Sequence, residues 1–227
     1  MNPKWSEMNK TVQTRLKKES TFSEGIGTLF SLRADLFSEL LRLRAELNRS
    51  EFSAIPFLGA NGYHSKTIAY SVWHIFRIED IVAHTLIAGD GQIFFTKNYR
   101  ERIGAPIITT GNELVGERIA EFSEQLDLDE LYRYAAEVRE ETERLLNRLS
   151  FADLKRKMTE EDKARLVLTE TVSGDENAKW LIGYWCGKDV RGLIQMPFSR
   201  HWIMHIEASL RIRQRLSAIG KGRKNDC

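Results

Sequence analysis

Apolar residues recur at intervals of three and four along most of this chain, and this spacing constrains the fold more than any other feature. The two clearest series are Leu29, Leu32, Leu36, Leu40 and Leu43, and then Leu131, Tyr134, Ala135, Val138, Thr142 and Leu145. Such spacing places the side chains on one face of an α-helix. No convincing run of alternating apolar residues indicates a β-sheet. The sequence therefore predicts an all-α protein in which amphipathic helices share a core.

Local signals divide the chain into helices and connections. Capping patterns at residues 21–24, 110–113 and 127–130 predict three helix starts, and a further helix is expected from about Lys66 to a stop at Gly89. Pro197 can open the last helix, and several short helices are expected between residues 150 and 196. The stretch from Gly89 to Thr110 is long for a helix connection, so it either covers a site or packs as an ornament on its own aromatic side chains.

Two histidines, His201 and His205, stand four residues apart in the last helix. They belong to its apolar stripe, which also holds Phe198, Ala208, Ile212, Leu216 and Ile219. A helix directs residues at this spacing to the same side, which is how helices grip metal ions. His74 lies in the apolar stripe of the helix that ends at Gly89, and it completes a candidate set of three ligands. The alternative is a group of core histidines whose nitrogens are all hydrogen-bonded.

Other possible ligands fit the pattern less well. His84 lies about 80° around the helix from His74, so we expect it at the rim or in solvent. Glu79 lies about 140° from His74, and Glu207 about 160° from His205. No Glu-x-x-His occurs in the chain, which argues against a carboxylate-rich di-iron bundle. Three neutral nitrogen ligands leave a coordination position open, as in catalytic metal sites, where the ion lowers the pKa of a bound thiol or water.

Composition excludes several classes of function. The 34 basic and 32 acidic residues nearly balance, so bulk charge demands neither nucleic acid nor an anionic membrane. Two cysteines, Cys186 and Cys227, are too few for a disulfide framework, and Cys186 is expected to be buried and inert. The sequence contains no run of about eighteen apolar residues and no stretch at its start typical of a signal peptide. We therefore expect a cytoplasmic protein that does not span a membrane.

One histidine on the second long helix and a His-x-x-x-His on the last resemble the DinB-like family of damage-inducible, metal-binding four-helix bundles. The resemblance covers roughly residues 22–219 and rests on Ser71-Val-Trp-His74-Ile-Phe-Arg-Ile-Glu79 and Arg200-His201-Trp-Ile-Met-His205. It implies an up-down-down-up bundle, frequently dimeric, in which His74, His201 and His205 hold a divalent ion, often zinc or nickel. Some branches of the family are transferases or isomerases that use a low-molecular-weight thiol such as bacillithiol or mycothiol.

This resemblance predicts a four-helix bundle of DinB-like type over residues 21–220, with an N-terminal arm at 1–20 and a basic tail at 221–227. The 89–110 loop and the short helices at 150–196 depart from the compact family pattern. The expected function is a metal-dependent enzyme in which the three histidines activate a thiol or water for transfer or hydrolysis of a small-molecule substrate. The alternative is a stress-response or binding protein that keeps the bundle without turnover. The family name does not imply nucleic-acid binding, because the chain lacks a basic recognition element.

Overall fold

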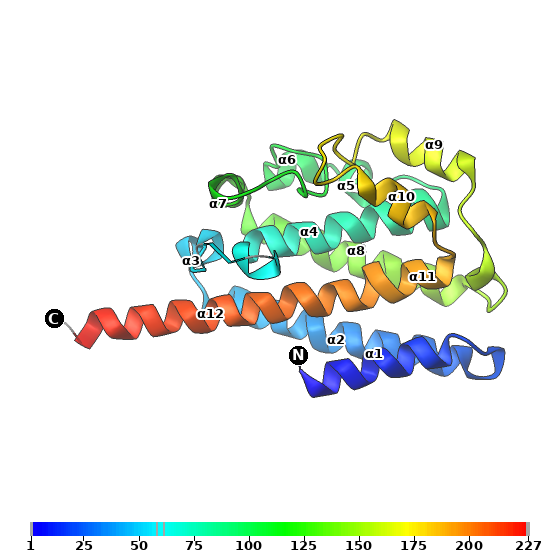
Figure 1. The fold of residues 1–227 in the computed structure, drawn as a ribbon, viewed down its shortest axis with the longest axis horizontal. Helices are drawn as coiled ribbons and strands as arrows, with labels where there is room; N and C mark the ends of the chain where they lie inside the picture. Colours follow the sequence, from blue (N-terminus) through cyan, green and yellow to red (C-terminus); the bar gives the residue numbers. More distant parts are fainter. Residues whose placement is uncertain (1, 58, 61, 226–227) are drawn as a thin grey trace.

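The computed structural model describes residues 2–57, 59–60 and 62–225, and it shows an all-α protein built around four long helices (Figure 1). These are α2 (Phe22–Glu46), α4 (Ile68–Asp80), α8 (Leu128–Arg148) and α12 (His201–Asn225). No β-strand occurs among the described residues, where Lys157 and Asp189 form an isolated β-bridge. The predicted fold class is confirmed.

The four helices run up, down, down and up in chain order (Figure 1). Arg44 near the end of α2 pairs with Asp129 at the start of α8 at 2.7 Å, so these two helices are antiparallel. Arg33 in the middle of α2 bonds the carbonyl of Phe198, and Arg213 of α12 pairs with Glu46 at the end of α2. The helices α2 and α12 are therefore parallel, and α4, which contacts both α8 and α12, runs against α12.

The apolar stripes identified in the sequence form the core. All five leucines of the α2 stripe are buried, as are all six residues of the α8 stripe. In α12 the stripe is buried as far as Ile212, while Leu216 is partly buried and Ile219 is exposed. Burial therefore ends where α12 extends beyond its neighbours (Figure 1).

Every residue of α4 is buried, which places this helix at the centre of the molecule. One side faces the bundle, and the other is covered by residues 89–127, which contain α5 (Ile93–Thr96), α6 (Tyr99–Ile103) and α7 (Glu117–Gln125). Buried charges on this side are fully bonded. Arg77 donates to Asp80, Gln92 and the carbonyl of Ile108, and Asp80 accepts the backbone N–H groups that begin α5. This network fixes the 89–110 segment against α4.

Two π-helical stretches extend the helices that carry the histidines. Residues Ile81–Ala88 (η3) continue α4 to a left-handed Gly89, so the predicted stop is confirmed. Ahead of α12 lie α11 (Val190–Gln195) and the π-turn η5 (Met196–Arg200), without a break in the chain of helical residues. The prediction that Pro197 opens the last helix is therefore wrong. Asp189 caps an earlier start, and the wider turn accommodates a proline that has no N–H to donate.

The three predicted helix starts have different outcomes. Asp127 accepts the N–H of Glu130 and begins α8 as expected. Thr21 stands before α2, but its hydroxyl bonds the carbonyl of Arg15 instead of capping the helix. No helix begins at Thr110, whose hydroxyl bonds Asn112. A turn follows it, and α7 starts only after Gly116.

The remaining helices flank the bundle. Residues 1–20, expected to form an arm, contain α1 (Pro3–Arg15), which packs along α2 through Trp5, Val12 and Leu16. The short elements are η1 (Glu19–Thr21), α3 (Arg49–Ser53), η2 (Gly62–Ser65), η4 (Asp153–Lys155), α9 (Glu160–Leu168) and α10 (Trp180–Cys186). Within the described part of the chain, no helix combines the length and apolar character needed to cross a membrane. Of the expected basic tail, residues 226–227 lie outside the described residues.

Candidate metal centre

The three histidines singled out in the sequence lie together in the structure. His74 comes from α4, and His201 and His205 come from the first two turns of α12, which crosses α4 in the opposite direction. One ring nitrogen from each lies within 4.8 Å of the others, and all three side chains are buried. The ring centroids are 4.7 to 5.0 Å apart. The donors therefore converge on one point between the two helices.

The ring of His74 is held in one orientation by the end of the 89–110 segment. Its Nδ1 lies 2.7 Å from the carbonyl oxygen of Thr110, which can only accept, so Nδ1 carries the proton. Nε2 is consequently the nitrogen with a free lone pair. Tyr70 stacks on the ring at 5.4 Å, and its hydroxyl donates to the carbonyl of Gly111. Burial lowers the pKa of His74 to about 4, although the bond to Thr110 opposes this shift.

His201 and His205 lack the partners that buried imidazoles normally have. Nδ1 of His201 and both ring nitrogens of His205 are buried, and none of the described residues forms a hydrogen bond with them. Burial, and then the neighbouring histidines, hold the pKa of each well below the usual value, so both rings are neutral at pH 7. Leaving a buried polar atom unpaired costs about 1–3 kcal/mol. Neutral nitrogens with free lone pairs that face a third such nitrogen are the donor set of a divalent transition-metal ion such as zinc. These residues therefore fit a metal.

The two carboxylates nearest in sequence do not join the cluster. Glu79 forms a fully buried ion pair with Arg33 through bonds of 2.7 and 2.9 Å, and it also accepts the indole N–H of Trp202 at 2.8 Å. Glu207 accepts the backbone N–H of Asn2. The angular separations predicted from the sequence thus agree with the structure, and the site consists of three nitrogens.

His84 also lies apart from the cluster. Its Nδ1 pairs with Asp90 at 2.6 Å across the turn that ends η3. The expectation that it sits at the rim or in solvent is wrong, because only 7% of the residue is exposed. Asp90 bonds Nδ1, whereas Nε2 of His84 is buried with no hydrogen-bond partner among the described residues.

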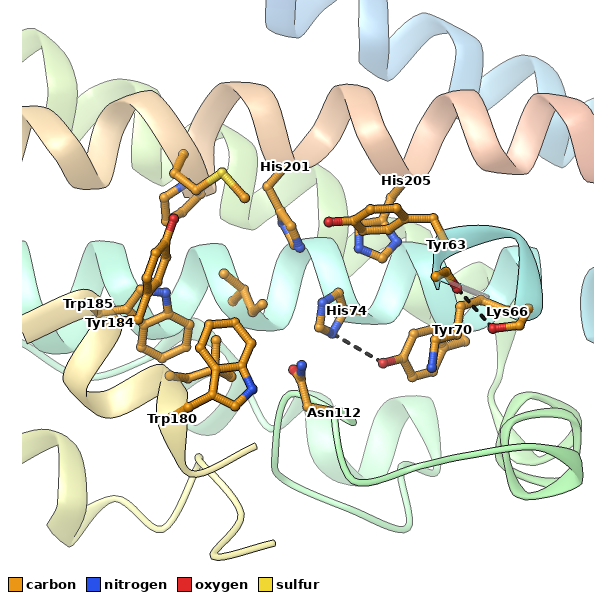
Figure 2. Close-up of a pocket in the computed structure, with 16 residues that line it drawn as sticks. Tyr63, Lys66, Tyr70, His74, Asn112, Trp180, Tyr184, Trp185, His201 and His205 are labelled. Atoms are coloured by element: carbon orange, nitrogen blue, oxygen red, sulfur yellow. Dashed lines mark hydrogen bonds between the residues drawn. The ribbon is translucent and has the colours of Figure 1, made fainter. Parts of the chain in front are cut away.

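The triad opens into a cavity of about 410 Å³ (Figure 2). This volume is in the range of small-molecule sites. One end of the cavity is lined by Tyr63, Lys66 and Tyr70, and the other by the aromatic side chains of α10. The histidines lie between these ends, with Asn112 opposite α12 (Figure 2). The candidate ligands are therefore accessible to a small molecule.

The helix α10, not the 89–110 segment, forms the outer wall of this cavity. Its side chains Trp180, Tyr184 and Trp185 line the cavity. None of residues 89–110 is among the lining residues. The segment is neither a cover for the site nor an ornament. It packs against α4, and its backbone carbonyls accept hydrogen bonds from α4 side chains. The carbonyl of Ile108 accepts from Arg77, that of Thr109 from Trp73, and that of Thr110 from His74.

Several functional candidates were missed in the sequence. Lys66, Tyr70 and Asn112 line the cavity beside the triad, and Tyr63 contacts His205 edge-on at 4.7 Å. Tyr70 had a signal, because it shares the stripe of His74. The others lie outside the long helices, where no periodicity marks them: Tyr63 in η2, Lys66 just before α4, and Asn112 in a turn. Cys186 does not line the cavity: it is partly buried beside α9, and burial raises its pKa. Cys227 lies outside the described residues.

Comparisons with known proteins agree with this architecture. Residues 29–175, more than half of the chain, match the sequence model of the DinB superfamily. A crystal structure of a conserved protein from Enterococcus faecalis is similar with a TM-score of 0.56, over 82% of this chain and 93% of that one. The two chains are 14% identical, so this likeness concerns the fold alone. No curated protein matches the chain. The matched stretch includes His74 but ends before α12, which carries the other two histidines.

Proposed function

Because this chain belongs to the DinB superfamily, we propose that it binds a divalent metal ion through His74, His201 and His205 and acts as a metal-dependent enzyme on a small molecule. The observation that carries the proposal is the set of buried, unpartnered nitrogens on His201 and His205, facing His74 in a cavity. The reaction that we propose is thiol-dependent transfer. The thiol would come from a low-molecular-weight cofactor, because Cys186 does not line the cavity.

The residues around the triad would prepare it for this role. A bound divalent ion would lower the pKa of a thiol or water at its open position. The carbonyl of Thr110 fixes the tautomer of His74, so that Nε2 is free to coordinate. The low pKa values of the three rings keep them unprotonated at neutral pH. The aromatic side chains of α10 limit the access of water to the triad.

Two alternatives remain distinct from this proposal. A hydrolase would use the same three ligands with water in place of the thiol. A non-catalytic binding protein would keep the bundle but needs neither a cavity beside the ion nor an oriented ligand. The 410 Å³ cavity and the bond from His74 to Thr110 therefore favour an enzyme. A cluster of satisfied core histidines is disfavoured, because among the contacts of the described residues His74 alone of the three bonds a backbone carbonyl.

The first experiment is metal analysis by elemental mass spectrometry on protein purified without a histidine tag or chelator. We expect about one ion per chain, and at least a tenfold loss in a His201→Ala variant and in the His74/His201/His205 triple alanine variant, with helix content retained. His84→Ala is the matched control, because this histidine is equally buried but bonds Asp90. Wild-type protein without metal after reconstitution, or variants that retain it, would refute the assignment.

A second experiment separates the two chemistries. Metal-loaded protein is assayed with an electrophilic substrate in the presence and absence of a low-molecular-weight thiol. Turnover that requires the thiol supports transfer, whereas turnover without it supports hydrolysis. No turnover with either, in protein that holds the ion, would favour the binding protein. The preference for zinc or nickel, the homodimer and the cytoplasmic location remain predictions.

A further inference from the structure

The two ends of the cavity differ in chemistry. Lys66 and Tyr70 lie on one side of His74, whereas Trp180, Tyr184 and Trp185 lie on the other side (Figure 2). The three histidines occupy the middle. A molecule long enough to fill the cavity would therefore meet a cation at one end and apolar surface at the other, with its central atoms beside the triad.

Lys66 is a cation without a counter-ion. Its Nζ lies 3.5 Å from the carbonyl of Leu114, a long bond, and 5.0 Å above the ring of Tyr70. Among the described residues no carboxylate lies within ion-pair distance of it, and the acid of this region, Glu113, bonds Thr109 instead. Lys66 is partly buried, and this burial lowers its pKa. A partly desolvated ammonium group of this kind attracts an anionic group of a ligand.

The opposite end offers apolar surface that the fold itself leaves open. Trp180 is 51% exposed although it borders a cavity, and Tyr184 meets it edge-on at 5.6 Å. The indole N–H of Trp180 already donates to the carbonyl of Asn177, so the rest of the ring has no polar requirement. Trp185 closes the wall behind them and is 1% exposed. Aromatic walls of this type bind apolar or aromatic groups of ligands.

We infer that the substrate is an amphipathic anion, with a carboxylate or similar group on Lys66 and an apolar, preferably aromatic, portion against Trp180 and Tyr184. This inference deepens the proposed function and rests on it for the identity of the site. It also places the reacting bond between the two groups, because the triad lies between the two ends of the cavity. Neutral aromatic molecules and small hydrophilic anions are each expected to bind more weakly than a molecule that carries both groups.

A pair of nearly isosteric probes tests the charge. Binding of 2-naphthylacetate and 2-naphthylacetamide to the full chain is measured by titration calorimetry. We expect the carboxylate to bind roughly tenfold more tightly than the amide, because a charged hydrogen bond to a partly buried ammonium contributes at least that factor. Lys66→Met should abolish the preference, and Lys66→Arg should retain it. Equal binding of the two probes to the wild type would overturn the inference.

Lys188 provides the matched control. Its ammonium also lies over a cavity-lining tyrosine, 4.2 Å from the ring centroid of Tyr184, but the residue does not itself line the cavity. Lys188→Met should leave the preference for the carboxylate unchanged. An equal loss in the Lys188 and Lys66 variants would show a general charge effect and overturn the assignment of the anion to Lys66. Trp180→Ala should weaken the binding of both probes by a similar factor. Unchanged binding would refute the assignment of the apolar portion of the ligand to Trp180.

The titrations are repeated on protein stripped of metal, since a carboxylate can also bind an ion directly. The Lys66-dependent preference should persist there, and Lys66→Met should hold as much metal as the wild type. If the wild-type protein binds metal but does not prefer the carboxylate, the inference is refuted and the proposed function is not. If the protein prefers the carboxylate but never binds metal, the proposed function is refuted and the inference is not. N-acetylcysteine and its amide form a further pair. If only this pair depends on Lys66, the anion belongs to the thiol cofactor and the inference fails.

Discussion

The buried ion pair between Arg33 and Glu79 allows a stringent test of how the bundle is held together. Both side chains are 0% exposed, and two bonds of 2.7 and 2.9 Å join them. Glu79 also accepts the indole N–H of Trp202, and Arg33 donates to the carbonyl of Phe198. These contacts link α2, α4 and the start of α12. The other carboxylate on Arg33, that of Glu143, is 21% exposed.

We predict that Glu79→Gln lowers the free energy of unfolding by about 3–5 kcal/mol. The substitution keeps the shape of the side chain and an oxygen that can accept from Trp202, but it leaves the charge of Arg33 buried without its main partner. Breaking one side of a fully buried pair has a cost of this size. For a chain of this length the melting temperature should fall by about 6–20 °C, since each kcal/mol corresponds to about 2–4 °C.

The assay is urea unfolding followed by circular dichroism, with the midpoint and the slope compared between variants. Glu143→Gln is the matched control and should cost at most about 1 kcal/mol, because this pair is partly screened by solvent. In the double variant Arg33→Met/Glu79→Gln the unpaired charge is gone, so it should be more stable than Glu79→Gln alone. A loss below about 1 kcal/mol for Glu79→Gln, or no recovery in the double variant, would refute the reasoning.

Three further predictions concern the surroundings of the triad. Burial holds the pKa of His74 at about 4, so between pH 6.5 and 4 the unfolded chain binds a proton at this residue that the folded chain does not. As the pH falls through this window, the free energy of unfolding of the metal-free protein should decrease by about 3 kcal/mol from His74 alone. Urea midpoints measured across the window should therefore depend less steeply on pH in His74→Gln than in the wild type. In Gly111→Ala the new Cβ would lie 3.0 Å from the ring of Tyr70, at a backbone φ of +80° that L residues rarely adopt. The backbone should shift and displace the neighbouring Thr110 carbonyl that orients His74, so metal binding should weaken roughly tenfold in a competition titration. Gly116→Ala, which has no atom near its new Cβ, should leave metal binding unchanged. His84→Ala should leave metal content at the wild-type level, because its Nδ1 pairs with Asp90 away from the triad, and a loss of metal would assign His84 to the site. Loss of the ion pair itself should cost at most about 1 kcal/mol of stability, since the Asp90 side chain is 57% exposed and stays solvated without its partner.

The parts of the molecule that follow from local periodicity could be predicted from the sequence. An apolar stripe such as that of α2 or α8 indicates which face of the helix is buried, and those residues are buried in the structure. The spacing of His201 and His205 likewise fixes that both imidazoles leave α12 on one side. Angles along α4 correctly separated Glu79 from His74. In each case one helix supplies the whole argument, so no knowledge of its neighbours is needed.

The parts that depend on contacts between distant segments could not be predicted. Nothing near Lys66 in the sequence indicates that it lacks a counter-ion, since this depends on which carboxylates fold towards it. The role of Thr110 rests on a backbone carbonyl, which carries no residue-specific signal. The capping pattern at residues 110–113 was misleading for a local reason, because the Thr110 hydroxyl bonds Asn112 within a turn instead of capping a helix. Arg33, a charged residue beside the leucine stripe, becomes intelligible only when Glu79 is placed opposite it.

The alignment of α4 with α12 connects the stability of the bundle to the geometry of the triad. The family match supports the part of the bundle that contains His74, but His201 and His205 lie beyond it, so their position depends on how α12 docks. The bond between Trp202 and Glu79 joins the residue next to His201 to the residue five positions after His74. It therefore fixes the register of the two helices at the triad itself. Glu79→Ala, which removes the acceptor of this bond that Glu79→Gln keeps, should consequently weaken metal binding as well as folding, although the residue contributes no ligand atom, whereas Glu143→Gln should affect neither appreciably.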